Sequence, residues 1–235
     1  MEKRLTEKAL HEPLSNYVAG VYNTLGSVVQ GVALGALFYV LTEMQSKGRL
    51  DLANSVKCVV VVSLIALLWH RYAVHNQFAV WRLEIQDTLI PIGFTVLQLW
   101  LALAVPEHVA WFAAALSAIS LLGALAYWNT TWRYNKPESL ELFREHFSEE
   151  DPDFSRDLRD SINSFQKLSI LLTFISATVM GELALINFSC DFLDEDGKTY
   201  VTVVVAEAII GLSFRYDLRW WLNHRSGSRI SRYVW

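Results

Sequence analysis

The segment VAWFAAALSAISLLGALAY, residues 109–127, decides the fold class of this chain, because none of its 19 residues carries a formal charge. A helix of about 20 apolar residues is long enough to cross the hydrocarbon core of a bilayer. The segment LSILLTFISATVMGELALINF, residues 168–188, has the same character and contains one charged residue, Glu182. We therefore expect an integral membrane protein built from helices.

The composition of the whole chain supports this expectation. Hydrophobic residues make up 53% of the 235 residues and charged residues 19%, and the mean hydropathy is +0.26. These values are too apolar for an ordinary soluble domain of this length. The predicted fold is an all-α bundle of six transmembrane helices, at residues 17–41, 52–68, 88–105, 109–127, 168–188 and 200–214. A bundle with fewer spans would leave the third or the sixth segment in the membrane interface.

The distribution of basic residues predicts the orientation. Lys and Arg accumulate on the cytoplasmic side of membrane proteins. With both termini in the cytoplasm, 16 of the 20 basic residues fall on that side, and the other four are Lys47, Arg49, Lys57 and Lys198. Compact loops, and an N-terminus without an evident cleavable targeting segment, favour the inner membrane of a bacterium.

The first four predicted spans fall within residues 1–128 and the last two within residues 168–214, and two further segments lie outside these regions. Residues 129–167 are expected to form a short cytoplasmic helical hairpin that can dock a protein partner, with Asp153 opening a helix that continues into the fifth span. The tail 215–235 mixes Arg with aromatic residues, which is typical of a segment on an anionic lipid surface. Its predicted interfacial anchors are Trp220, Trp221, Arg225 and Arg229.

Glu182 and Glu207 are the candidate ion-path residues in the fifth and sixth spans. Each lies about 12 residues from Asp194, at the centre of the connecting loop. At a rise of 1.5 Å per residue, the two carboxylates reach about the same depth in the outer half of the bilayer. Carboxylates at such a depth are costly and often mark a proton relay or a cation site. The structural alternative is that each is neutral and hydrogen-bonded, or that one reaches the outer interface.

Asn23, Ser27 and Gln30 form a polar stripe in the first span, with spacings of four and three residues. A polar stripe on a membrane helix normally faces protein or water, so these three residues are further path candidates. The same helix contains Gly31 and Gly35, and this GxxxG spacing permits close approach of a second helix. Packing between helices or between subunits explains the glycines equally well.

The connection between the second and third spans is rich in polar and aromatic groups. Its candidate residues for an inner vestibule or a lipid-headgroup contact are His70, Arg71, Arg82, Glu84 and Asp87. Lipid contact and surface ion pairing are the less specific explanation of these charges. Asp87 is also the expected N-cap of the third span.

Signatures of catalysis and of cofactors are absent from the sequence. No HExxH, phosphate-loop, GxSxG or CxxC motif occurs. We therefore expect no enzyme, no metal or cofactor, and no nucleic-acid partner. The leading hypothesis is a homo-oligomeric cation or proton channel, or a subunit that translocates ions. The alternative is a membrane anchor or sensor that holds a cytoplasmic partner in a signalling or defence assembly, and a lipid-modifying enzyme is a third, weaker reading.

Overall fold

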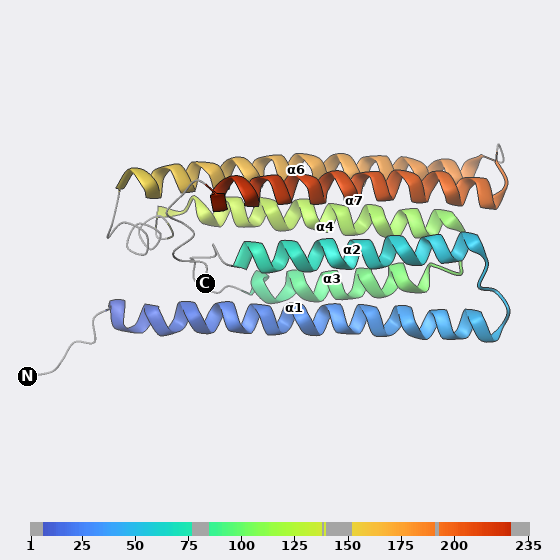
Figure 1. Cartoon of the computed structure of the whole chain (residues 1–235), viewed down its shortest axis with the longest axis horizontal. Helices are drawn as coiled ribbons and strands as arrows, with labels where there is room; N and C mark the ends of the chain where they lie inside the picture. The colour runs from blue at the N-terminus through green and yellow to red at the C-terminus, as the bar shows by residue number, and fades with distance from the viewer. Residues whose placement is uncertain (1–6, 77–84, 138, 140–151, 191–192, 227–235) are drawn as a thin grey trace, which may run out of the picture.

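A computed structural model describes residues 7–76, 85–137, 139, 152–190 and 193–226, and this part of the chain is all-helical (Figure 1). Its six helices are α1 (Glu7–Ser46), α2 (Leu52–Asn76), α3 (Gln86–Leu103), α4 (Val109–Tyr134), α6 (Pro152–Ser189) and α7 (Glu195–Ser226). The expectation of an all-α fold is confirmed. Each of the six apolar windows found in the sequence overlaps one of these helices.

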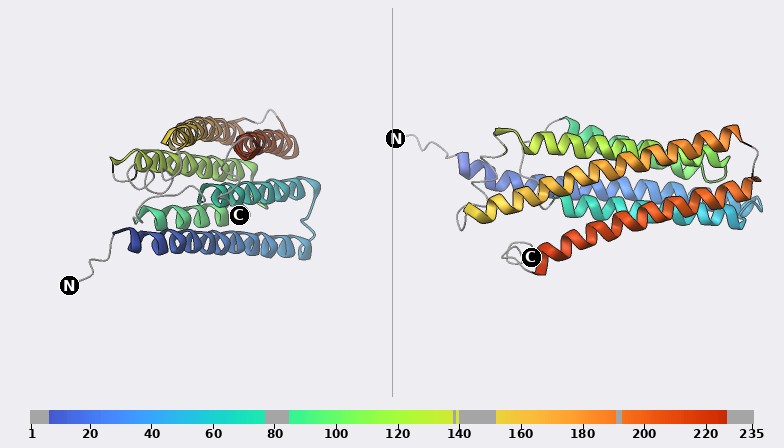
Figure 2. Two further views of the ribbon diagram at one scale, coloured as in Figure 1. Left: turned by 60° about the vertical axis from the view of Figure 1, so that its left-hand side comes forward. Right: turned by 90° about the horizontal axis from the view of Figure 1, so that it is seen from above.

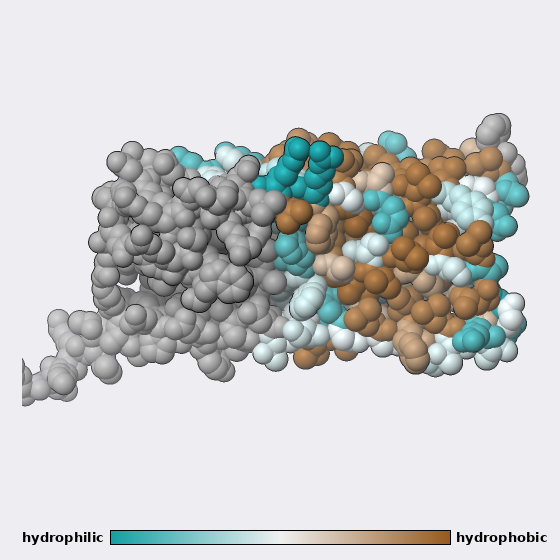
Figure 3. Space-filling model, in the orientation of Figure 1, coloured by the Kyte–Doolittle hydropathy of each residue, from teal (hydrophilic) through white to brown (hydrophobic). Residues whose placement is uncertain are grey.

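Four of the described helices are long and apolar enough to cross a membrane, namely α1, α2, α4 and α6. The apolar part of α3, Thr88–Leu103, is shorter, and α7 is interrupted by polar and charged residues. Both nevertheless run alongside the four long apolar helices (Figures 1 and 2). Apolar residues also cover much of the described surface in Figure 3. The chain is therefore a helical membrane protein with several candidate spans.

The six described helices form a narrow ring. The neighbours around it are α1, α3, α4, α6, α7 and α2, and α2 packs back on α1 to close the circuit. The first residue of α1 and the last residue of α7 lie at the same end of the bundle, here called the terminal end (Figure 1). The connections α1–α2, α3–α4 and α6–α7 lie at the other end, here called the distal end.

Helices α4 and α6 pack more closely than any other pair in the ring. Small residues permit this approach, because a Cβ added to Gly123 would lie 3.6 Å from Thr173 and one added to Gly181 would lie 3.2 Å from Ser117. The Ser117 hydroxyl also donates a hydrogen bond of 2.7 Å to the Ala177 carbonyl across the interface. Small residues and interhelical hydrogen bonds are the usual adhesives between helices in a membrane.

Basic side chains secure the distal end. Lys57 donates hydrogen bonds of 3.0 Å each to the carbonyls of Val105 and Glu107, in the connection between α3 and α4. Arg49 donates to the Pro106 carbonyl of the same connection, and Lys198 donates to the Asn187 carbonyl at the end of α6. These contacts give three of the four basic residues of this end a structural role.

Two helix boundaries test the expectations made from the sequence. The expected continuous helix from Asp153 into the fifth span is confirmed, because α6 runs without a break from Pro152 to Ser189. The expected N-cap at Asp87 is wrong. Helix α3 begins at Gln86, and its N-cap residue, Ile85, has helical backbone angles and makes no side-chain cap.

Candidate functional site

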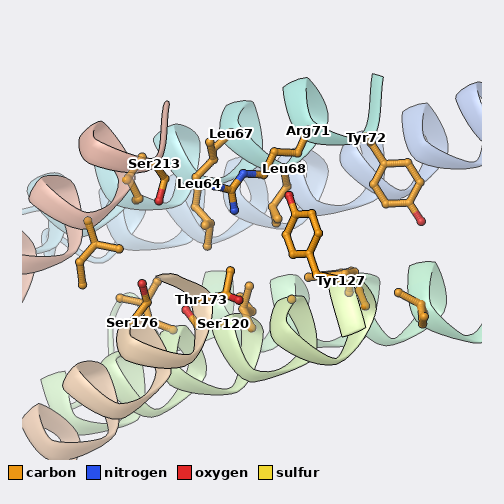
Figure 4. A pocket seen from close by; sticks show the side chains of 18 of the residues that line it. Leu64, Leu67, Leu68, Arg71, Tyr72, Ser120, Tyr127, Thr173, Ser176 and Ser213 are labelled. Atoms are coloured by element: carbon orange, nitrogen blue, oxygen red, sulfur yellow. The ribbon is translucent and has the colours of Figure 1, made fainter. Parts of the chain in front are cut away.

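A cavity of about 160 Å³ lies inside the ring (Figure 4). Five of the six described helices contribute to its wall, and α1 is the exception. The wall is mostly aliphatic, with Leu64 from α2, Phe94 from α3 and Ile210 from α7 among its residues. Hydroxyl groups come from seven lining residues, Tyr72, Ser120, Tyr127, Thr130, Thr173, Ser176 and Ser213. The site is thus an apolar chamber with a few polar groups, which is the usual make-up of a small-molecule pocket.

The two lining hydroxyls of α6 are already engaged with their own helix, as is that of Thr130, which donates to the Ala126 carbonyl of α4. Thr173 donates 2.7 Å to the Ser169 carbonyl, and Ser176 donates 2.7 Å to the Leu172 carbonyl. This bond to the preceding turn is common for Ser and Thr in membrane helices. It leaves the oxygen lone pairs as the groups that these two residues offer to the cavity.

Arg71 and Asp217 form an ion pair beside the cavity, toward the terminal end. Arg71 Nε lies 2.7 Å from Asp217 Oδ2 and Arg71 Nη2 lies 3.3 Å from Asp217 Oδ1, so both carboxylate oxygens are engaged. The Arg71 side chain is 11% exposed and that of Asp217 4%. The pair therefore joins α2 to α7 in a setting with little water, where an unpaired charge would be costly.

Aromatic rings surround this ion pair. The Arg71 guanidinium carbon lies 5.7 Å from the centre of the Tyr127 ring, which belongs to α4 and lines the cavity (Figure 4). Next to Asp217, Tyr216 stacks on Phe165 of α6 at 5.4 Å. On the other face of α7, Phe214 stacks on His70 of α2 at 5.0 Å. The ion pair and its neighbouring rings thus come from four helices, α2, α4, α6 and α7.

The residues expected at the inner vestibule are only partly described. His70 and Arg71 lie in α2, the first stacked on α7 and the second in the ion pair just given. Arg82 and Glu84 lie outside the described residues. Asp87 belongs to α3, and its side chain is outside the described part. The partner of Arg71 is thus an acid in α7, which the sequence analysis did not connect with it.

Glu182 and Glu207 occupy different surroundings. Glu182 is exposed on α6, whereas Glu207 is half-buried on α7. The Oε1 atom of Glu207 is buried and has no hydrogen-bond partner among the described residues. Phe214, two helical turns after Glu207 and hence on the same side of α7, contacts α2. Glu207 therefore points to the α2 side of α7, and no hydrogen bond joins the two glutamates.

The three residues of the polar stripe in α1 also differ in their exposure. Gln30 is buried, Ser27 is exposed, and the side chain of Asn23 lies outside the described part. Gln30 and Gln98 of α3 line one small pocket of about 10 Å³ next to the main cavity. The Oε1 atom of Gln30 and both amide atoms of Gln98 are buried and have no hydrogen-bond partner in the part of the chain that the structure describes. Space of this size holds about one water molecule, which would satisfy them.

The predicted interfacial anchors lie at or beyond the end of α7. Trp220 is half-buried, and its indole N–H donates 3.2 Å to the Ser161 hydroxyl of α6. Trp221 and Arg225 belong to α7, with side chains outside the described part, and Arg229 lies outside the described residues. Trp220 therefore joins α7 to α6 at the terminal end.

No protein family, characterised protein or solved structure matches the chain.

Proposed function

We propose that this chain translocates ions across a membrane, with protons or small cations as its substrates. The observation that carries the proposal is the buried Arg71–Asp217 pair beside a cavity that five helices of the ring line. Ionisable side chains within membrane helices are expensive and commonly mark an ion path or a gate. Here the pair bridges α2 and α7, so breaking it would free these helices to separate.

The proposed orientation places the terminal end in the cytoplasm and six helices across the bilayer, in the inner membrane of a bacterium. The bias of 16 basic residues out of 20 toward that side supports this topology. Helices α3 and α7 run alongside α1, α2, α4 and α6, and this arrangement supports the count of six spans. In this orientation the ion pair closes the cytoplasmic mouth of the cavity.

Oxygen atoms near the cavity suit a proton or a cation. The lining hydroxyls present lone pairs. Glu207 lies on the α2 side of α7, and one of its carboxylate oxygens has no hydrogen-bond partner among the described residues. Because Arg71 is neutralised by Asp217, the mouth has no net positive charge to repel a cation. Glu207 is therefore the carboxylate that we assign to the ion path. Glu182, which is exposed on α6, is the matched control position for substitutions of Glu207.

Association of several copies remains part of the proposal, although the cavity lies within a single chain. The GxxxG residues Gly31 and Gly35 are exposed on α1, and a Cβ at either position would meet nothing within 4 Å. An open small-residue face of this kind suits close packing against a helix of a second copy.

The test is ion flux into liposomes that contain the purified protein. Proton and K⁺ flux are measured for the wild type, Arg71→Gln, Asp217→Asn, and the reversed pair Arg71→Asp/Asp217→Arg. We expect each single change to raise flux several-fold, because it unlocks α2 from α7, and the reversed pair to restore the wild-type rate. Equal flux in all four proteins would contradict a gating role for the pair.

The second candidate is a membrane sensor or anchor for a cytoplasmic protein. The observation that favours it is the length of α6, whose 38 residues extend about 57 Å, against a hydrocarbon core of about 30 Å. A helix of this length can carry a displacement from the membrane to a partner docked on residues 129–167. Deletion of residues 136–160 would then abolish partner capture without affecting insertion. The sensor would be favoured if no liposome showed ion flux and the deletion abolished partner capture.

A further inference from the structure

The guanidinium of Arg71 has an unused hydrogen-bonding edge. An arginine side chain carries five N–H donors, and Asp217 takes one from Nε and one from Nη2. The three other donors, two of them on Nη1, make no hydrogen bond within the described part of the chain. Arg71 is also one of the residues that line the cavity (Figure 4). A molecule in the cavity can therefore reach donors that the protein itself leaves without an acceptor.

Charge balance restricts what that molecule can be. Arg71 and Asp217 together carry no net charge, and their side chains are almost completely buried. A carboxylate or phosphate at the unused edge would leave one excess negative charge in this poorly hydrated site, at a high desolvation cost. A carbonyl or hydroxyl oxygen accepts the same hydrogen bonds without adding charge. The chemistry therefore favours a neutral acceptor group.

The rest of the cavity suits an apolar body. Its wall is dominated by aliphatic and aromatic side chains from five helices. A cavity of about 150 Å³ with an apolar wall is known to stay dry and to bind benzene, and the volume here is about 160 Å³. An aromatic ring or a short stretch of acyl chain has the matching size.

We propose that the cavity binds a neutral amphiphile, with an apolar ring or chain among the leucines and a carbonyl or hydroxyl oxygen on Arg71. Such molecules include ketones, esters, quinones and alcohols of medium chain length. This binding site goes beyond the proposed ion translocation and does not require it. A bound amphiphile would occupy the proposed path, so it would also block flux if flux occurs.

Photo-crosslinking in liposomes tests the proposal directly. The probe is a medium-chain methyl ketone with a diazirine in its chain, and the comparison probe is the carboxylate of equal length. Labelled peptides are identified by mass spectrometry, with and without an excess of the plain ketone. We expect the ketone to label cavity-lining peptides of α4, α6 or α7, the plain ketone to compete by at least fivefold, and the carboxylate to label them far less.

Variants on one helix separate the cavity from the lipid-facing surface. Ala206 is 3% exposed and lines the cavity, whereas Val204, two residues earlier, is 66% exposed. Ala206→Phe fills the cavity and should abolish competed labelling, and Val204→Phe should leave it unchanged. Ser213→Leu is a second filling variant, used if Ala206→Phe does not insert. Labelling that is spread over exposed helix faces, uncompeted, or equal for both probes would overturn the proposal, whether or not the protein conducts ions.

Discussion

Breaking the Arg71–Asp217 pair on one side should destabilise the fold strongly, whereas removing both charges together should not. The relevant variants are Arg71→Met, Asp217→Leu and the double variant. Each single change leaves one charge among side chains that admit little water, since the two partners are 11% and 4% exposed. Removal of one partner from a buried pair costs about 3–5 kcal/mol.

The double variant replaces two buried charges by apolar side chains of similar size. Such a replacement is often neutral or stabilising by about 1–4 kcal/mol. The two substitutions should therefore be far from additive: the single costs sum to about 6–10 kcal/mol while the double variant loses nothing, so the coupling free energy should be at least about 6 kcal/mol. Reversible unfolding by dodecyl sulfate in mixed micelles, followed by circular dichroism, gives the free energy of unfolding for all four proteins.

An additive result would refute this reasoning. If the cost in the double variant equalled the sum of the single costs, Arg71 and Asp217 would not depend on each other in the folded protein. The same conclusion would follow if either single variant lost less than about 1 kcal/mol, the usual limit for exposed pairs.

Three further substitutions test contacts away from the ion pair, each measured by the same unfolding titration. Lys57→Met leaves two backbone carbonyls of the α3–α4 connection without their donor and should cost about 2 kcal/mol, whereas Lys47→Met, at a side chain that is 56% exposed, should change little. Asn187→Ala removes a buried hydrogen bond of 3.1 Å to a threonine hydroxyl of α7 and should cost about 1 kcal/mol; an unchanged midpoint would show that this bond contributes nothing. Gly197→Ala brings a Cβ to 2.8 Å from Asp194 Oδ1, which accepts from the Gly197 amide, so it should destabilise the start of α7 by about 1 kcal/mol. Full stability of that variant would contradict the contact.

Counting residues from a connecting loop predicts how deep a side chain lies in the bundle. It does not predict on which face of its helix the side chain lies. The apolar windows located all six described helices, because hydrophobic length is a strong local signal. The same counting placed Glu182 and Glu207 at similar depths. It could not show that Glu182 is exposed or that Glu207 points to the α2 side of its helix, because those directions depend on how α6 and α7 pack in three dimensions.

The ion pair was missed for a related reason. Arg71 was considered with the acids near it in sequence, and Asp217 was assigned to an interfacial tail because the sixth span was ended at Phe214. Helix α7 instead continues to Ser226. Arg71 lies 20 residues from Asp51 and Asp217 lies 23 residues from Asp194, both counted from the distal end. This match in depth was present in the sequence and makes the pair possible, whereas the facing of the two side chains depends on how α2 and α7 pack.

Thiol modification inside the cavity is the most direct test of whether ions pass through the helix ring. Ser213 is 8% exposed and lines the cavity, and the adjacent Leu212 is 67% exposed. Ser213→Cys and Leu212→Cys are made in a protein whose two native cysteines, Cys58 and Cys190, are replaced by alanine. Ion flux into liposomes is then measured before and after a small water-soluble thiol reagent is added. The account predicts that the reagent stops flux through Ser213→Cys and leaves Leu212→Cys unchanged. Unaltered flux through Ser213→Cys despite complete modification, or a block at Leu212→Cys instead, would contradict a path through the ring.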